Sequence, residues 1–167
     1  PLRQLIEQDQ VTSCVFWGPP GSGKTTLAKV IARRTKAHFQ EMSAVTAGVP
    51  DIRLAVETAT RLLRAMGQKT ILFIDEIHRF NKAQQDVLLP HIERGTVTLI
   101  GATTENPSFA LNAALLSRTR VFVLEKVSVE AMEKVIERAI CDKERGLGNE
   151  RIHMLPEVRR ELAVLAD

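Results

Sequence analysis

Cysteine is scarce in this sequence. Cys14 and Cys141 are the only two among 167 residues, and they lie far apart. This number excludes a disulfide scaffold, and the spacing is not typical of a metal site. Two unpaired thiols suit a reducing compartment, so we expect a protein from outside the secreted, disulfide-stapled class.

Long apolar runs are also missing. The longest aliphatic and aromatic run near the middle of the chain is Ile-Leu-Phe-Ile at residues 71–74. A membrane-spanning helix needs ~20 apolar residues, so none is expected. The first residues contain neither a basic segment nor an apolar one, and no secretory signal is visible. The sequence predicts no membrane partner.

Strong charge of either sign is absent, because 23 basic and 20 acidic residues leave a net charge of +3. A mildly basic chain permits contact with a polyanion but does not require it. The composition is that of a globular protein, with 44% apolar and 26% charged residues. The length suits one ordinary domain, or one domain and the beginning of a second.

Short apolar segments alternate with amphipathic ones along most of the chain. Strands are predicted at 13–17, 38–42, 69–74, 97–101 and 120–124, and helices at 1–10, 25–35, 51–66, 81–93 and 111–116. Pro90 is expected to kink or break the helix at 81–93. Beyond residue 124 only helices are predicted, at 129–140 and 156–165.

This order predicts an α/β protein in two parts. Residues 1–126 would form an α/β core, a five-stranded parallel sheet with helices on both faces. Residues 127–167 would begin a smaller helical domain. Neither an internal repeat nor a low-complexity segment interrupts this pattern.

A glycine-rich loop follows the first predicted strand and precedes a helix, and it matches G-x-x-x-x-G-K-[ST] in full. Its residues are Gly18, Pro19, Pro20, Gly21, Ser22, Gly23, Lys24 and Thr25. Backbone amides and the helix N-terminus in such a loop bind the phosphates of a nucleotide. We expect Lys24 to reach the β- and γ-phosphates, Thr25 to ligate Mg²⁺, and Thr26 to contact the α-phosphate.

Two acidic residues, Asp75 and Glu76, end the buried third strand. Asp75 is expected to hold Mg²⁺ through its water shell, together with Thr25. Glu76 is expected to orient or deprotonate the attacking water. The chain has no N-K-x-D motif for reading guanine, so the nucleotide is predicted to be ATP. The interval between Lys24 and Asp75 leaves room for a helix, a strand and a helix, which implies an extra strand between the two nucleotide-binding strands.

Other polar residues lie near the expected site. Thr103 and Thr104 end the fourth strand and could hold the attacking water or the γ-phosphate, or could simply bond to turn backbone groups. Ser43 could restrain Glu76, or could merely start a loop. His78 completes a D-E-x-H string, but we interpret it as a polar residue in a surface turn.

Three basic residues have two possible interpretations each. Arg118 follows a short predicted helix and could reach a neighbour's γ-phosphate, although its spacing alone favours a surface salt bridge. Arg79 and Lys82 flank the start of the helix at 81–93 and could contact DNA phosphates, or could belong to a solvated helix start.

The chain resembles the AAA+ ATPases in strings that are more specific than the phosphate loop. H-R-F-N-K-A-Q-Q-D at 78–86, G-A-T-T-E-N-P-S-F at 101–109 and A-L-L-S-R at 114–118 are similar to the replication-associated recombination protein A/Werner-helicase-interacting protein family. The resemblance covers essentially the whole chain and favours the bacterial branch.

The resemblance implies a P-loop NTPase (AAA+) fold whose second part is the start of a helical lid, and Mg²⁺-dependent ATP hydrolysis. It implies that Thr104 is the sensor-1 residue and that Arg118 is an arginine finger acting in trans. It further implies a homo-oligomer acting on DNA at stalled or gapped replication forks, with single-strand-binding protein or helicase partners. The expected location is the cytoplasm (the bacterial nucleoid), or the nucleus in a eukaryote.

Two other functions share these features. A clamp-loader or branch-migration subunit would have the same site residues but should lack the 78–86 string. A degenerate module would bind ATP without hydrolysing it, although Lys24, Asp75, Glu76 and Arg118 argue against that. The resemblance also implies that the segment near the adenine and the sensor-2 arginine lie outside residues 1–167.

Overall fold

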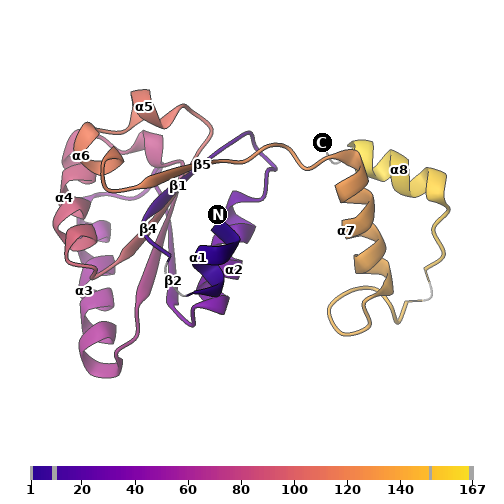
Figure 1. The fold of residues 1–167 in the computed structure, drawn as a ribbon, viewed down its shortest axis with the longest axis horizontal. Coiled ribbons are helices and arrows are strands. Elements are labelled where there is room, and N and C mark those ends of the chain that lie inside the picture. Colours follow the sequence, from indigo (N-terminus) through magenta and orange to yellow (C-terminus); the bar gives the residue numbers. More distant parts are fainter. Residues whose placement is uncertain (1, 9–10, 151, 166–167) are drawn as a thin grey trace. The chain divides into compact units, whose positions relative to one another are not determined.

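The computed structural model describes residues 2–8, 11–150 and 152–165 (Figure 1). The chain divides into two compact units, residues 1–124 and 125–167. Each unit is described by itself. The identity of the second as the start of a lid domain stays a prediction.

The first unit is built on a five-stranded sheet in the order β2-β3-β4-β1-β5, and every pair of neighbours is parallel. The strands are β1 (Cys14–Trp17), β2 (His38–Ser43), β3 (Thr70–Asp75), β4 (Thr98–Thr103) and β5 (Arg120–Val123). In the sequence, β2 lies between the phosphate loop and the acidic end of β3. In the sheet, however, β2 is an edge strand and does not lie between β1 and β3. The strand inserted between β1 and β3 is β4. The predicted fold class, a five-stranded parallel sheet, is confirmed.

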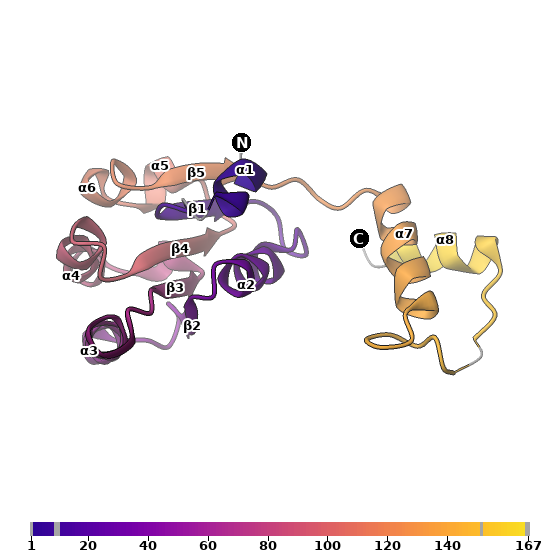
Figure 2. The ribbon, with the colours of Figure 1, turned by 60° about the horizontal axis from the view of Figure 1, so that its bottom comes forward.

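Helices cover both faces of this sheet (Figures 1 and 2). They are α1 (Leu2–Glu7), α2 (Lys24–Arg34), α3 (Val49–Met66), α4 (Lys82–Glu93), α5 (Pro107–Ala110), α6 (Ala113–Leu116) and the 3-10 turn η1 (Ile77–Arg79). Side chains alternate across the strands. Phe16, Phe73 and Ile100 therefore pack with α2 on one face, while Leu72 and Leu99 lie in a core with α3 and α4 on the other.

Helix α4 begins at a capping box and continues through Pro90. Asn81 Oδ1 accepts from the Gln84 amide at 2.9 Å, and Gln84 Oε1 accepts from the Asn81 amide at 2.9 Å, which is a capping box. Of the two expectations for Pro90, a kink or a break, the break is wrong, because the helix contains Pro90 and ends at Glu93. The kink stays a prediction. Leu88 and Ile92 on either side pack on the core, and this packing maintains the helix despite one missing backbone bond.

The second unit consists of α7 (Val129–Cys141), α8 (Pro156–Leu165) and the loop between them. Ser128 Oγ accepts from the Ala131 amide at 3.2 Å and caps α7. Arg159 Nη1 lies 3.1 Å from Glu137 Oε1 and links the two helices. No helix among the described residues of either unit is long and apolar enough to cross a membrane.

Candidate nucleotide-binding site

The phosphate loop connects the end of β1 to the start of α2. Gly21 and Gly23 have φ of 76° and 81°, a left-handed conformation that L side chains rarely adopt. At Gly18 a Cβ atom would lie 2.2 Å from the Leu124 carbonyl oxygen, so a side chain there would collide with the backbone after β5. The loop therefore requires glycine at these three positions for two different physical reasons.

The ammonium of Lys24 is held at the centre of this loop. Its Nζ donates to the carbonyl oxygens of Gly18 and Pro19, both at 2.8 Å, and to Ser22 Oγ at 3.4 Å. Lys24 is only 8% exposed. A phosphate oxygen entering the loop can take these donors from the neutral carbonyls, because hydrogen bonds between charged groups are stronger.

A cavity of about 350 Å³ opens above the loop, where the carboxyl ends of the parallel strands meet. The residues that line it come from the loop, from the start of α2 and from the ends of β3 and β4: Pro20, Gly21, Gly23, Lys24, Thr25, Thr26, Asp75, Glu76 and Thr104. The structure thus brings together most of the residues that the sequence singled out. Gly18, Pro19 and Ser22 frame the loop through their bonds with Lys24.

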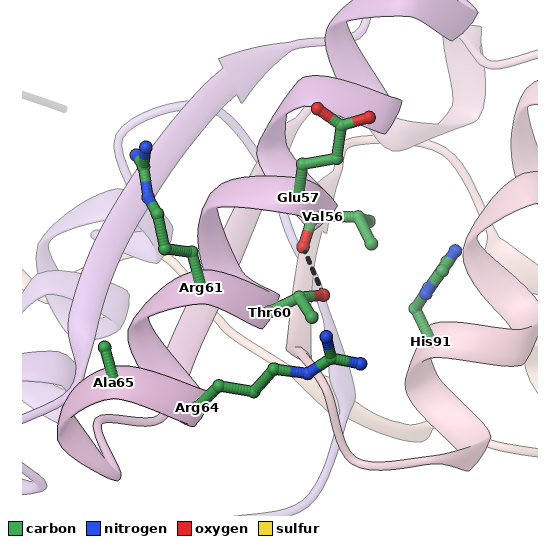
Figure 3. A pocket seen from close by; sticks show the side chains of 7 residues that line it. All are labelled: Val56, Glu57, Thr60, Arg61, Arg64, Ala65 and His91. Carbon is green, nitrogen blue, oxygen red and sulfur yellow. Dashed lines mark hydrogen bonds between the residues drawn. The ribbon is translucent and has the colours of Figure 1, made fainter.

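A larger cavity, of about 610 Å³, lies elsewhere, between α3 and α4 (Figure 3). Its lining is Val56, Glu57, Thr60, Arg61, Arg64, Ala65 and His91. Thr60 Oγ1 donates to the Val56 carbonyl at 2.8 Å, within its own helix. Burial, and then the nearby charge of Arg94, lowers the pKa of His91. The larger cavity is therefore not the one with the chemistry of a nucleotide site, because its lining offers neither a phosphate loop nor paired carboxylates. We assign the nucleotide site to the smaller cavity at the phosphate loop.

Glu76 adopts an unusual backbone conformation directly after β3. Its φ of 53° and ψ of 44° are left-handed, which is uncommon for a residue other than glycine. Its amide donates to Asp75 Oδ1 at 3.2 Å. Such conformations cluster at functional sites, where the surrounding structure maintains them. Here the left-handed residue lies between β3 and η1, and its side chain lines the cavity together with that of Asp75.

The position of His78 differs from the expectation. The sequence indicated a surface turn, but the side chain is only 5% exposed. Its Nε2 lies 3.3 Å from Glu76 Oε2, and its Nδ1 lies 3.0 Å from Thr103 Oγ1. The 3-10 turn η1 causes the difference, since it buries Ile77 and directs His78 back toward the end of β4. The D-E-x-H spacing puts His78 two residues after Glu76 in the sequence, but it does not by itself predict that the side chain is buried.

The two threonines after β4 have separate environments. Thr103 is fully buried, and its hydroxyl donates to the Glu105 carbonyl at 3.1 Å and accepts from the Glu105 amide at 3.0 Å. Thr103 therefore takes the turn-stabilising role. Thr104 lines the cavity, where a sensor-1 residue would contact the γ-phosphate.

Ser43 takes the simpler of its two roles. Its Oγ accepts from the Val45 amide at 3.3 Å, which organises the turn after β2. In the part of the chain that the structure describes, no hydrogen bond joins Ser43 to Glu76.

Arg118 lies away from the cavity, at the end of α6. Its guanidinium is ion-paired with the Glu93 carboxylate, and Nη1 donates to the Ala114 carbonyl at 2.8 Å. In the single chain Arg118 thus forms the surface salt bridge that its spacing allowed. Its role as a finger for a neighbouring chain stays a prediction. Arg79 and Lys82 are both exposed.

Comparisons with known proteins agree with this geometry. Residues 14–128 match the model of the ATPase family associated with various cellular activities (AAA). The chain is 56% identical over 167 residues to replication-associated recombination protein A of Escherichia coli strain K12, covering all of this chain and 37% of that protein. It is 48% identical over 166 residues to ATPase WRNIP1 of Dictyostelium discoideum, covering 99% of this chain and 19% of that protein. The resemblance noted from residues 78–86 and 101–109 is confirmed.

Solved structures give the same result. The Thermotoga maritima RuvB Holliday junction branch migration motor superposes with a TM-score of 0.71 at 30% identity, over 97% of this chain and 52% of that one. The chain therefore spans about a third of its bacterial relative and about half of this structural neighbour. With a matching family model, a phosphate loop and paired carboxylates at the strand ends, this nucleotide-binding chain belongs to the ATPase family associated with various cellular activities.

Proposed function

We propose that this protein hydrolyses ATP to ADP and phosphate in the 350 Å³ cavity. One observation carries the proposal. A single cavity is lined by the phosphate-loop lysine, a hydroxyl next to it, and two consecutive carboxylates at the end of β3. These groups are the parts that P-loop NTPases use to bind phosphates and to activate water.

The protein's own groups fit a magnesium–nucleotide complex. Among the described residues, no group of three or more His, Cys, Asp or Glu side chains could hold a metal ion. Thr25 and Asp75 offer one hydroxyl and one carboxylate, and Mg²⁺ accepts such a small set when phosphates and water complete its coordination. When bound, Mg²⁺ neutralises charge on the β- and γ-phosphates.

Each side chain then has a defined task. Lys24 and the loop amides bind the phosphates, and Thr26 contacts the α-phosphate. Glu76 accepts a proton as a water oxygen bonds to the γ-phosphorus and the bond to the β–γ bridging oxygen breaks. Thr104 orients the γ-phosphate or the water. Glu76 is half-buried, with 33% of its side chain exposed, so water can reach it.

We further propose that the active form is a homo-oligomer in which Arg118 reaches a neighbour's ATP. The guanidinium does not line its own cavity, yet 39% of the side chain is exposed and available to another chain. Guanidinium is suited to bidentate contact with phosphate and to transition-state charge.

The proposed substrate is DNA at stalled or gapped replication forks, with single-strand-binding protein or a helicase as a partner. Support comes from the name of the 56% identical bacterial relative, replication-associated recombination protein A. The location that fits this role is the bacterial nucleoid. A branch-migration role is the second candidate because of the RuvB neighbour, but that similarity is only 30%.

The test is ATP turnover by the full-length protein on forked, single-stranded and blunt duplex DNA. Stimulation by the fork or the single strand above the blunt duplex supports the first role. A four-way junction is added as a further substrate, and stimulation by this junction alone supports the second role. Binding of ATP without any turnover contradicts both.

A further inference from the structure

We propose that His78 is a positioning residue, which holds the Glu76 carboxylate in place and connects it to the end of β4. The inference rests on the proposed role of Glu76 in ATP hydrolysis. Nothing in the D-E-x-H spacing alone assigns this task to the histidine, because the sequence is equally compatible with a surface turn.

Both nitrogens of the buried imidazole are engaged. Nε2 lies 3.3 Å from Glu76 Oε2 and 3.4 Å from Glu105 Oε1, while Nδ1 lies 3.0 Å from Thr103 Oγ1. A ring nitrogen that faces two carboxylate oxygens must carry a hydrogen. Without it, the lone pair of the nitrogen would point at the lone pairs of both oxygens and be repelled by them. Nε2 therefore donates, and it has a single hydrogen to share between Glu76 and Glu105. Nδ1 is then an acceptor, and the single hydroxyl hydrogen of Thr103 is shared between Nδ1 and the Glu105 carbonyl.

This sharing makes Glu105 a competitor of Glu76. When the hydrogen of Nε2 points to Glu76, the carboxylate has a fixed partner at Oε2. When it points to Glu105, that restraint is lost. Glu105 follows Thr104 directly, so a movement of the segment that contacts the γ-phosphate is transmitted through His78 to Glu76.

The turn that bears the imidazole is fixed in place by the packing of its neighbour Ile77. Ile77, fully buried, lies across Gly101 of β4, where an added Cβ would come within 2.9 Å of Ile77 Cδ1. The Arg79 amide donates to the Glu76 carbonyl at 2.8 Å and closes the 3-10 turn. The ring is thus held against the sheet, and a fixed ring can restrain a carboxylate at the cavity wall.

The test uses three substitutions of His78 in the full-length protein, with DNA-stimulated phosphate release and ATP affinity as measurements. The amide nitrogen of His78→Gln can take the position of Nε2, whereas that of His78→Asn reaches only the position of Nδ1. His78→Phe removes both polar atoms. His153→Asn, at an exposed histidine of the second unit, is the matched control.

We expect kcat to fall about 10- to 100-fold in His78→Asn and His78→Phe, as for other groups that orient a catalytic residue. The affinity for ATP should stay unchanged in both, and His78→Gln should recover most of the lost kcat. Glu105→Ala should raise kcat, because it removes the competing acceptor of the Nε2 hydrogen, and a lowered kcat would contradict this competition. In a Glu76→Gln background, His78→Asn should have no further effect, since it acts through Glu76.

Two results separate this inference from the proposed function. If Glu76→Gln is inactive but His78→Asn and His78→Gln both keep the wild-type kcat, His78 is not a positioning residue and ATP hydrolysis by Glu76 stands. If Glu76→Gln hydrolyses ATP at the wild-type rate, the proposed role of Glu76 is wrong, and the inference about His78, which depends on it, is wrong as well. Equal losses in His78→Asn and His78→Gln, with a lowered Tm, would show a purely structural role and overturn the inference.

Discussion

Arg118 and Glu93 form an ion pair on the surface of the first unit, with 39% and 48% of their side chains exposed. An exposed pair of this kind contributes about 0.2–1 kcal/mol. That is small beside the contribution of an arginine finger to phosphoryl transfer, so the pair can break whenever a neighbouring chain offers a triphosphate. Glu93 therefore holds Arg118 without preventing its proposed task.

The first prediction concerns this arginine. Arg118→Ala should lower the kcat of the full-length oligomer by roughly 10³-fold while ATP affinity is retained, because a finger acts on the transition state. Glu93→Gln should change kcat by no more than about fivefold, the equivalent of an exposed ion pair. Phosphate release and nucleotide titration measure both effects.

A mixing experiment tests whether Arg118 acts in trans. Arg118→Ala chains have an intact site without a finger, and Glu76→Gln chains have a finger without a base. Mixed oligomers should regain part of the activity that each variant lacks alone. If the mixture stays as inactive as its components, Arg118 does not serve a neighbour.

The second prediction is that Lys24→Ala abolishes measurable ATP binding. Hydrogen bonds to charged groups contribute about 1.5–3 kcal/mol each, and Lys24 can donate several to the phosphates. Calorimetry measures the affinity. Lys29→Ala, an exposed lysine of the same helix, is the matched control and should bind normally. Unchanged affinity in Lys24→Ala would contradict the assignment of the loop.

Much of this architecture follows from local signals. The sequence predicts every strand to within a few residues. For β1, β3 and β4 the reason is that a buried parallel strand has a nearly unbroken apolar pattern, whereas the edge strands β2 and β5 are partly exposed. The positions of Asp75 and Thr104 follow from their places at strand ends. The environment of His78 could not be predicted, because it depends on how a 3-10 turn packs Ile77 against Gly101 of a strand far along the chain.

Contacts between segments that are distant in the sequence could not be predicted from local patterns either. The spacing of Arg118 allows a salt bridge but does not name Glu93 as its partner. Pro90 suggested a break, yet the packing of its neighbours on the core maintains α4. Both the partner of Arg118 and the continuity of α4 depend on tertiary packing, which leaves no periodic pattern in the sequence.

The third prediction concerns DNA. Arg79 and Lys82 are exposed just beyond the acidic strand end. Replacing both with Ala in the full-length protein should weaken DNA binding, and should reduce the salt dependence by about one unit per lost phosphate contact. The double change Arg33→Ala and Arg34→Ala, which removes the same charge from the end of α2, should leave the salt slope unaltered.

The fourth prediction tests the fold itself. Burial raises the pKa of the Cys14 thiol to about 12, whereas Cys141 is exposed. The thiolate is the nucleophile, so Cys14 should stay unmodified at pH 8 in the folded protein. Mass spectrometry after iodoacetamide treatment should find only Cys141 alkylated, and both thiols alkylated in denaturant. Rapid native alkylation of Cys14 would contradict the packing of β1.

The most direct test of the central claim, that Glu76 activates water for ATP hydrolysis, is a comparison of Glu76→Gln with the unaltered full-length protein. The amide keeps the size of the side chain but cannot accept a proton, so kcat should fall about 10²- to 10⁴-fold. ATP affinity, measured by calorimetry on the same sample, should stay unchanged. ATP turnover at the unaltered rate in Glu76→Gln would show that another group activates the water.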